Sequence, residues 1–188
     1  VLQGMILGKE EKQSVSYLAK FSKLLRAVLE NSRQKTVSLS RELSTIHSYV
    51  ELQNMDTQPP FRYQVHVASD VNTEKIEIPT MLIQPFVENA IEHAFKDQKD
   101  DKEIVVTIEF KEDRLLCSIA DNGIGINQTH QVAADHKNSL ATTITSERLK
   151  ILSKSFNTPG SIQVTDRTDF GEQGTQVSMI IPYKTNSN

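Results

Sequence analysis

The sequence has a single cysteine, no block of basic residues and no long apolar run. One cysteine in 188 residues, Cys117, excludes a disulfide framework and a cysteine-rich metal site, and we expect it to be a small buried side chain. The net charge is −3 and Lys and Arg do not cluster, so the electrostatic footprint of a nucleic-acid-binding protein is missing. No apolar stretch approaches the roughly 20 residues that span a bilayer. These absences predict a soluble domain that does not bind nucleic acid.

Two familiar nucleotide-binding motifs are also missing. No segment has the pattern GxxxxGK[ST], and the sequence DNGIGI at residues 121–126 lacks the third glycine of a dinucleotide fingerprint. Both of those nucleotide folds are therefore disfavoured. The composition, with 37% hydrophobic and 24% charged residues, is that of a globular chain with one core and an accessory element.

The N-terminal part predicts two amphipathic helices. In residues 13–31 a narrow apolar stripe has spacings of three and four; it consists of Leu18, Phe21, Leu25 and Val28. A stripe this narrow suits a partner helix in a dimeric bundle better than a deep core. Residues 38–55 begin with a capping signature, Ser38 or Ser40 ahead of Glu42, and His47 is interpreted as an exposed residue of this helix. One face of the second helix is apolar and carries Leu39, Leu43, Ile46 and Val50.

A change in composition at the sequence DTQPP, residues 56–60, predicts a domain boundary that separates residues 1–57 from residues 58–188. Beyond it, strands are predicted at residues 61–67, 103–110, 114–120, 161–166 and 175–182. Helices are predicted at residues 78–95 and 143–156, the second with an apolar face of Ile144, Ile151, Leu152 and Phe156. Residues 127–138 are polar and without period, which is typical of a loop. The element order predicts an α+β fold, a two-layer sandwich in which helices cover one face of a mixed sheet.

The predicted helix 78–95 carries polar residues opposite its apolar face, and Asn89 lies in the middle of them. An amide oxygen facing a cleft can ligate Mg²⁺, and Glu88 and Glu92 could supplement it; the alternative is a solvated helix surface. Pro85 requires either that the helix begin close to it or that a kink be tolerated. Asp121 ends a strand and could accept a hydrogen bond from an exocyclic amine.

The glycines at positions 123 and 125 lack Cβ, so a flat ring could approach their backbone, although an ordinary turn gives the same pattern. Four segments in order then carry a resemblance: LIQPFVENAIEHAF (82–95), DNGIGI (121–126), SERLKIL (146–152) and GEQGTQVSMIIP (171–182). Together they resemble the ATP-binding domain of sensor histidine kinases, the Bergerat-type fold that gyrase, Hsp90 and MutL share. Residues 17–55 are similar to the corresponding helices of the LytS-like family of these kinases.

The resemblance implies roles for the residues of the site. Asn89 would ligate a Mg²⁺ that bridges the phosphates of ATP, and His93 would face the phosphates, with Glu88 and Glu92 as further catalytic candidates. Asp121 would hydrogen-bond the adenine amino group in a pocket shaped by the two glycines of DNGIGI. The remaining implied ATP contacts are Gly123, Gly125, Gly174 and Thr175 around the nucleotide, helix-start amides near Ile144, and Lys137 in an ATP lid formed by residues 127–138.

The implied function is that of a two-component sensor kinase, a transferase in signal transduction. ATP would phosphorylate a histidine, and the phosphoryl group would pass to an aspartate in the receiver domain of a response regulator. The N-terminal helices would form a homodimer. The chain would be a cytoplasmic domain, and an upstream segment would anchor the full-length protein in the cytoplasmic membrane.

Two features depart from the family pattern. Ala141 stands where the family has a glycine, which restricts the backbone there. None of the five histidines lies in a PHFLFN-like phosphoacceptor motif, so we expect a fragment whose phosphoacceptor lies upstream. One alternative is a degenerate module that binds nucleotide or dimerises without phosphoryl transfer. Another is a hydrolytic ATPase of the gyrase or Hsp90 type, which is disfavoured because Pro85 occupies the position of the water-activating Glu.

Overall fold

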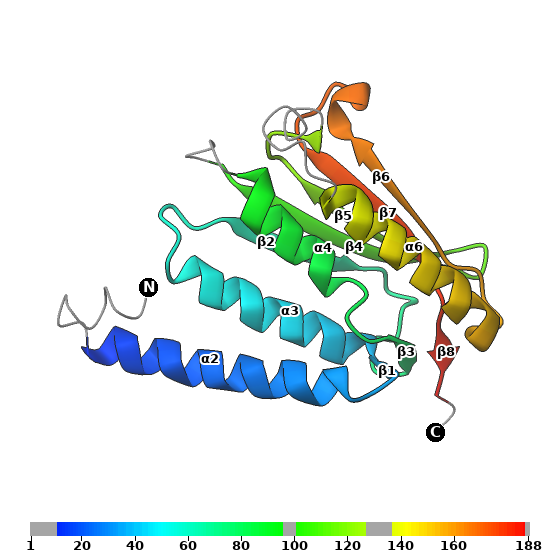
Figure 1. The fold of residues 1–188 in the computed structure, drawn as a ribbon, viewed down its shortest axis with the longest axis horizontal. Helices are drawn as coiled ribbons and strands as arrows, with labels where there is room; N and C mark the ends of the chain where they lie inside the picture. The colour runs from blue at the N-terminus through cyan, green and yellow to red at the C-terminus, as the bar shows by residue number, and fades with distance from the viewer. Residues whose placement is uncertain (1–10, 96–100, 127–136, 187–188) are drawn as a thin grey trace.

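The computed structural model describes residues 11–95, 101–126 and 137–186 (Figure 1). The helices are α2 (Glu11–Ser32), α3 (Leu39–Asn54), α4 (Gln84–Asn89) with its π-helical continuation η1 (Ala90–Ala94), and α6 (Lys137–Phe156). The strands are β1 (Thr36–Ser38), β2 (Arg62–Val67), β3 (Ile76–Pro79), β4 (Glu103–Lys111), β5 (Arg114–Asp121), β6 (Ser161–Asp166), β7 (Thr175–Ile181) and β8 (Lys184–Thr185). A short 3-10 helix, η2 (Arg167–Phe170), lies between β6 and β7.

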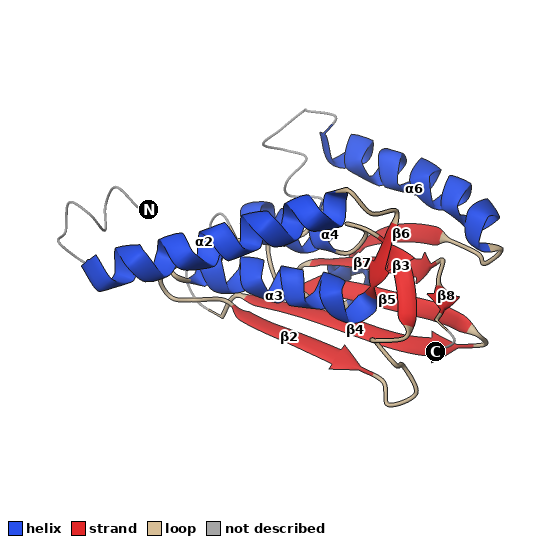
Figure 2. Ribbon diagram, turned by 90° about the horizontal axis from the view of Figure 1, so that it is seen from below, coloured by secondary structure: helices blue, strands red, loops and turns tan. Residues whose placement is uncertain are grey.

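The main sheet has five strands in the order β2-β4-β5-β7-β6. Strands β2 and β4 are parallel and the other pairs are antiparallel, so the predicted mixed sheet is confirmed. Helices α4 and α6 lie over one face of this sheet (Figure 2). Alternate residues of β4 and β5 face these helices and form the core, among them Ile104, Ile108 and Leu115, which are fully buried. The α+β two-layer sandwich is therefore confirmed.

A second, small sheet was not predicted. It has the order β1-β3-β8, and Val37 of β1 pairs with Ile78 of β3. Its strands are only two to four residues long, too short for an alternating pattern to stand out. The sheet ties the connection between α2 and α3 to the segment that leads into α4 (Figure 1).

The predicted helix over residues 78–95 is wrong in its first third. Ile78 and Pro79 belong to strand β3, and the chain turns at Met81, whose φ is 52°. The helix begins at Gln84, with Pro85 in its first turn where a missing N–H costs nothing. Side chains on both sides of the turn are buried, including Ile78, Leu82 and Ile83, so continuous burial imitated a helical face.

Helix α6 begins earlier than expected, at Lys137, so the last two residues of the predicted loop 127–138 are helical. Ile151 is 68% exposed and does not belong to the apolar face; Leu149 is fully buried in its place. Leu149 belongs to the main core and α6 contacts β6, whereas Leu152 and Phe156 are only half-buried.

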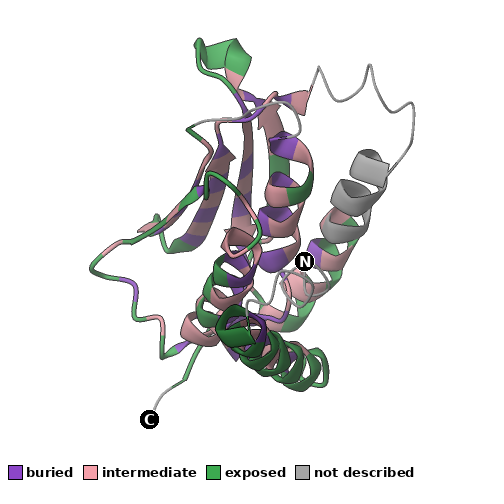
Figure 3. Ribbon diagram, turned by 90° about the vertical axis from the view of Figure 1, so that its left-hand side faces the viewer, coloured by how far each residue is buried: buried purple, intermediate pink, exposed green. Residues whose placement is uncertain are grey.

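The two N-terminal helices are confirmed. Helix α2 packs on α3 through one face, where Asn31 donates to the Thr45 hydroxyl at 3.1 Å. Its other face keeps Leu18, Phe21 and Leu25 between 40% and 46% exposed, and α2 is coloured largely as exposed in Figure 3. Across the described ranges, no helix combines the length and apolar character needed to span a membrane.

The capping of α3 differs in part from the prediction. Ser38 is the N-cap and accepts a hydrogen bond from the Arg41 amide at 3.3 Å. Glu42 does not complete this cap; its carboxylate is fully buried and accepts amides at the start of α4 instead. His47 is exposed, as predicted, and lies 3.6 Å from Glu51.

Candidate functional site

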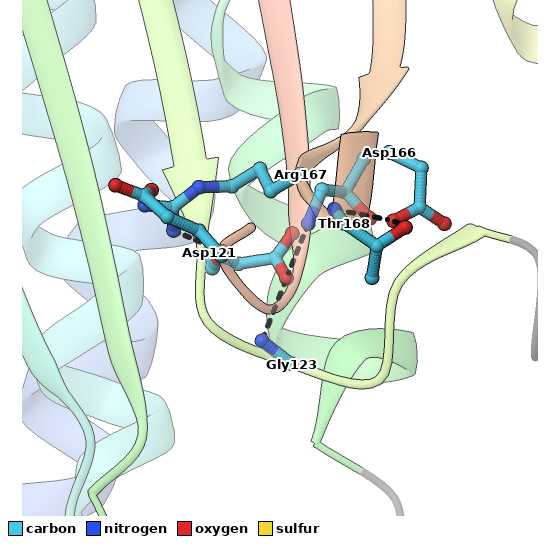
Figure 4. Close-up of polar contacts among 7 residues, drawn as sticks. Asp121, Gly123, Asp166, Arg167 and Thr168 are labelled. Carbon is cyan, nitrogen blue, oxygen red and sulfur yellow. Dashed lines mark hydrogen bonds and ion pairs between the residues drawn. The ribbon is translucent and has the colours of Figure 1, made fainter. Parts of the chain in front are cut away.

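A buried carboxylate lies at the end of the central strand of the main sheet. Asp121 is the last residue of β5 and is 6% exposed. Its Oδ1 accepts two backbone hydrogen bonds, from Gly123 at 2.9 Å and from Thr175 at 3.1 Å (Figure 4). Among the described residues, both donors bond this one oxygen. The second oxygen, Oδ2, thus retains the acceptor capacity that recognition of an exocyclic amine requires.

The surroundings of Asp121 act on the pKa of its carboxyl in opposing directions. Burial raises the pKa of the Asp121 carboxyl above its usual value, while the amides of Gly123 and Thr175 and the charge of Arg167 act in the opposite direction. Whichever form is present, the carboxyl is held by backbone atoms and not by flexible side chains. Such a group is positioned in advance for a ligand.

The glycines near Asp121 allow the surrounding elements to pack closely, and the approach of a flat ring to their backbone stays a prediction. A Cβ at Gly123 would lie 2.3 Å from the Ala94 carbonyl oxygen, so only glycine lets η1 approach this strand end. A Cβ at Gly174 would lie 1.9 Å from the Asp121 carbonyl oxygen. Gly125 has a φ of 78° and faces the Asp166 carboxylate. The segment DNGIGI therefore joins helix, strands and hairpin around Asp121.

The turn between β6 and β7 contributes residues that the sequence did not point to. Arg167 donates to the Asp121 carbonyl oxygen at 2.7 Å and pairs with Glu172 (Figure 4). Asp166 is buried and accepts from the Thr168 amide at 3.0 Å, which closes the turn. The signal in the sequence was the polar run between two strands, which a hairpin turn explains equally well.

Gly174 and Thr175 lie at the Asp121 end of the site. The Thr175 amide bonds the carboxylate, and the Gly174 carbonyl accepts from the Arg167 amide at 2.9 Å. Their backbone contacts are with Asp121 and Arg167, and the expectation that they flank phosphates stays a prediction.

The polar residues of the predicted helix 78–95 lie at the junction of α4 and η1. Asn89 is the last residue of α4 and is half-buried, as is His93 in η1. Glu88 accepts from the Gln84 side chain at 2.7 Å, and Glu92 is exposed and 3.9 Å from His93. A π-helical turn inserts one extra residue and is often found at functional sites. The π-helical turn is what sets the direction of His93 relative to Asn89.

This helix lies close to α3. Burial and the carboxylates of Glu88 and Glu92 raise the pKa of Tyr49, a half-buried residue of α3, to about 12. The negative charges of the candidate site therefore lie near enough to the N-terminal helices to act on their residues. Within the described ranges, no cluster of three or more His, Cys, Asp or Glu side chains is arranged to hold a metal ion.

Several predicted features are not brought into the site by the described residues. Residues 127–136 of the predicted lid lie outside the described ranges, and for Lys137 and Ala141 only the helical backbone of α6 is described. Ile144 lies seven residues inside α6, so its amide belongs to the helix interior and does not start the helix. The prediction of phosphate-binding amides near Ile144 is wrong.

A separate hollow of about 360 Å³ lies on the sheet face that no helix covers. Its lining is mostly hydroxyl and amide side chains of four strands, among them Thr107, Ser118, Gln163, Gln176 and Ser178. Asp121 points to the opposite face, because residues alternate along β5. The hollow is therefore not part of the site around Asp121.

Comparison with known families gives two matches. Residues 1–61 match the family "Histidine kinase", and residues 75–185 match the family "Histidine kinase-, DNA gyrase B-, and HSP90-like ATPase". A Sensor protein LytS of Staphylococcus epidermidis is 32% identical over 172 residues, 89% of this chain and 28% of the relative. A Sensor histidine kinase/phosphatase LytS of Staphylococcus aureus is 34% identical over 113 residues, 59% of this chain and 19% of the relative. The chain thus spans less than a third of the length of these relatives.

Solved structures share the fold at low sequence identity. The histidine kinase domain of the blue-light activated kinase EL346 from Erythrobacter litoralis gives a TM-score of 0.55 at 16% identity, covering 95% of this chain and 84% of that one. The catalytic domain of the histidine kinase ThkA gives a TM-score of 0.52 at 14% identity, covering 80% of this chain and 97% of that one. A structure of ThkA in complex with the response regulator TrrA gives 0.50 at 14% identity, covering 94% of this chain and 51% of that one.

Proposed function

Because the chain belongs to the family of histidine kinase-, DNA gyrase B- and HSP90-like ATPases and has LytS sensor proteins as relatives, we propose that it is the catalytic region of a LytS-like sensor histidine kinase. In the intact protein it transfers the γ-phosphoryl group of ATP to a histidine upstream of Val1. The observation that carries the proposal is Asp121, a buried carboxylate held through Oδ1 by two amides at the end of the central strand.

Adenine recognition is the role of Asp121. Its Oδ2 accepts a hydrogen bond from the adenine amino group, and the Gly123 and Thr175 amides keep the carboxyl in position. Arg167 holds the backbone of the same residue. Gly123, Gly125 and Gly174 let the surrounding elements close on this end of the site. The fit to a purine is one of donor and acceptor chemistry together with close packing.

The phosphate end is formed by the helix residues. Asn89 offers an amide oxygen, a ligand that suits Mg²⁺, and His93 lies one turn further on. Asn89 would hold such an ion together with the phosphate oxygens of the nucleotide. A Mg²⁺ bound there neutralises charge on the phosphates. Glu88 and Glu92 are the carboxylates nearest to Asn89 in sequence, and Lys137 is a further candidate contact.

The helices have the second role. Leu18, Phe21 and Leu25 of α2 are between 40% and 46% exposed, and an exposed apolar stripe of this kind suits a second copy of the chain. We assign homodimerisation to α2. We also divide the chain into a helical unit, residues 1–57, and an ATP-binding unit, residues 58–188. The phosphoryl group passes from the histidine to an aspartate in the receiver domain of a response regulator, and the histidine is regenerated. A further segment of the full-length protein attaches it to the cytoplasmic membrane.

Three measurements test the proposal. Calorimetry on the wild-type chain should show ATP binding that requires Mg²⁺ and weakens in Asn89→Ala. A chain extended upstream to include the histidine segment, incubated with labelled ATP, should incorporate acid-labile phosphate. Mg²⁺-ATP binding without any labelling of the extended chain would support the inert nucleotide-binding module instead. Sedimentation of Leu18→Lys/Leu25→Lys should show a shift from dimer to monomer.

A further inference from the structure

The turn between β3 and α4, residues 80–83, is bonded from the helical hairpin on one side and from α6 on the other. It contains Met81, a non-glycine residue with a φ of 52°. Such a backbone conformation is strained and persists only where the surroundings hold it in place. The contacts of this turn therefore indicate what positions the start of α4.

Glu42 of α3 supplies the contacts from the first side. Its Oε2 accepts from the Met81 amide at 3.0 Å, and its Oε1 accepts from the amides of Leu82 at 2.9 Å, Ile83 at 3.2 Å and Gln84 at 3.4 Å. The amides of Ile83 and Gln84 belong to the start of α4, which leaves them without an intrahelical partner, and those of Met81 and Leu82 belong to the turn before it. The cap of α4 therefore comes from another helix, 40 residues away in sequence.

The α2–α3 connection and α6 hold the same turn through its other groups. The Thr80 hydroxyl donates to the Gln34 carbonyl at 3.2 Å, and the Thr80 amide donates to the Lys35 carbonyl at 3.4 Å. Arg148 of α6 donates to the carbonyl oxygens of Thr80 and, at 3.3 Å, of Met81. Neither Glu42 nor Arg148 belongs to the nucleotide-binding residues proposed above.

Glu42 is an unusual choice for a merely structural cap. It is fully buried, and burial raises the pKa of its carboxyl although four backbone amides act in the opposite direction. A local Ser or Asp would cap α4 without this desolvation. A capping residue that belongs to α3 has one further consequence that a local cap lacks: the start of α4 must follow α3 when α3 moves.

We propose that Glu42 is a positioning residue of the nucleotide site, which fixes α4, and with it Asn89, relative to the helical hairpin α2–α3. Asn89 lies five residues after Gln84, about 7.5 Å along the helix axis. A displacement of residues 80–83 therefore reaches Asn89 through the short helix α4. A displacement of the hairpin therefore alters nucleotide affinity. The inference rests on the proposed function, because it takes Asn89 to be part of the nucleotide site.

Glu42→Gln tests the link with a minimal change. The amide oxygen of Gln still accepts from part of the turn, while its NH₂ group faces a backbone donor, so the cap is weakened and not removed. The matched control is Glu51→Gln, the same change at an exposed position of α3. Calorimetry with the non-hydrolysable analogue AMP-PNP and Mg²⁺ gives the affinity, thermal unfolding gives Tm, and hydrogen exchange reports the amides of residues 81–84.

We expect Glu42→Gln to weaken AMP-PNP binding about five-fold or more, with faster exchange at residues 81–84. Glu51→Gln should stay within about two-fold of wild type. A folded Glu42→Gln variant with a lower Tm but wild-type affinity overturns the inference, since the cap is then merely structural. If Glu42→Gln does not fold, Arg148→Gln provides the same comparison from α6. A wild-type chain that does not bind the analogue at all overturns the proposed function itself, which separates the two failures.

Discussion

Two buried carboxylates accept hydrogen bonds from backbone amides in different ways. Glu42 of α3 lies against the start of α4, and Asp121 lies at the end of β5. Both oxygens of Glu42 are engaged, by four amides in all. The two described amides that bond Asp121 both go to Oδ1. A carboxylate whose acceptors are all used can only hold the protein together, whereas one with an oxygen to spare can also bind a ligand. The difference separates a positioning residue from a recognition residue.

The largest effect is expected where the carboxylate is saturated. Glu42→Ala leaves four amides of the turn 81–84 without their acceptor in a buried place, so the free energy of unfolding should fall by about 3 kcal/mol. Urea unfolding followed by circular dichroism measures this. Glu51→Ala on the same helix is the control. A loss below about 1 kcal/mol would mean that water replaces Glu42 at little cost.

A change at Asp121 should affect ligand binding more than folding. In Asp121→Asn the amide oxygen can still accept from Gly123 and Thr175, but the NH₂ group cannot accept from adenine. We expect the affinity for ATP to fall by about 2 kcal/mol, roughly 30-fold, with little change in Tm. Asp169→Asn, at an exposed position of η2, is the matched control. Calorimetry that gives wild-type affinity for Asp121→Asn would remove Asp121 from the proposed base contact.

The two carboxylates should also share a pH dependence. Burial raises the pKa of both Glu42 and Asp121 in the folded state, so folding favours their protonated forms. The stability that each contributes is present below its unfolded pKa and is lost as pH rises through its folded pKa. The unfolding free energy of wild type minus that of Asp121→Asn should therefore fall as pH rises from below 3.8. A difference that increases with pH would instead mean that the pKa of Asp121 is lowered on folding.

The smallest effect is expected at an exposed carboxylate on the same helix as Glu42. Glu51 pairs with Lys20 at 3.1 Å, with both side chains more than 40% exposed. The Lys20 hydrogen bond lowers the pKa of Glu51, but solvent screens the pair. We expect Glu51→Gln to change the free energy of unfolding by about 0.5 kcal/mol or less, and by still less in high salt. A change above about 1 kcal/mol would show that the α2–α3 contact depends on this pair.

The elements that could be predicted are those whose side chains repeat with a period. The five strands of the main sheet and the two N-terminal helices were found because their apolar residues alternate or recur every three to four positions. Strands β1, β3 and β8 are too short for such a pattern. Residues 78–83 were misread because burial on every side leaves no polar face to fix the period. The start of α6 was missed for a related reason, a polar first turn.

The residues of the candidate site could be predicted only in part, for the same reason. Local order made Asp121 and the glycines of DNGIGI candidates, together with Asn89. The partners of Asp121 at Thr175 and Arg167 come from a hairpin about 50 residues away, and no local pattern marks them. The backbone contacts of Gly174 and Thr175 with Arg167 and Asp121 could not be predicted either, since their neighbours in space were unknown.

By itself the sequence determined the candidate site residues, through the family motifs around Asn89 and Asp121. It also determined the strands with a regular period and the apolar stripe of α2. Only the tertiary structure decided what the buried groups are bonded to. Glu42 was expected to cap its own helix and instead caps α4, because the amides of residues 81–84 face it across the core. Hydrogen-bond partners in a core are chosen by proximity in space, and the sequence records only proximity along the chain.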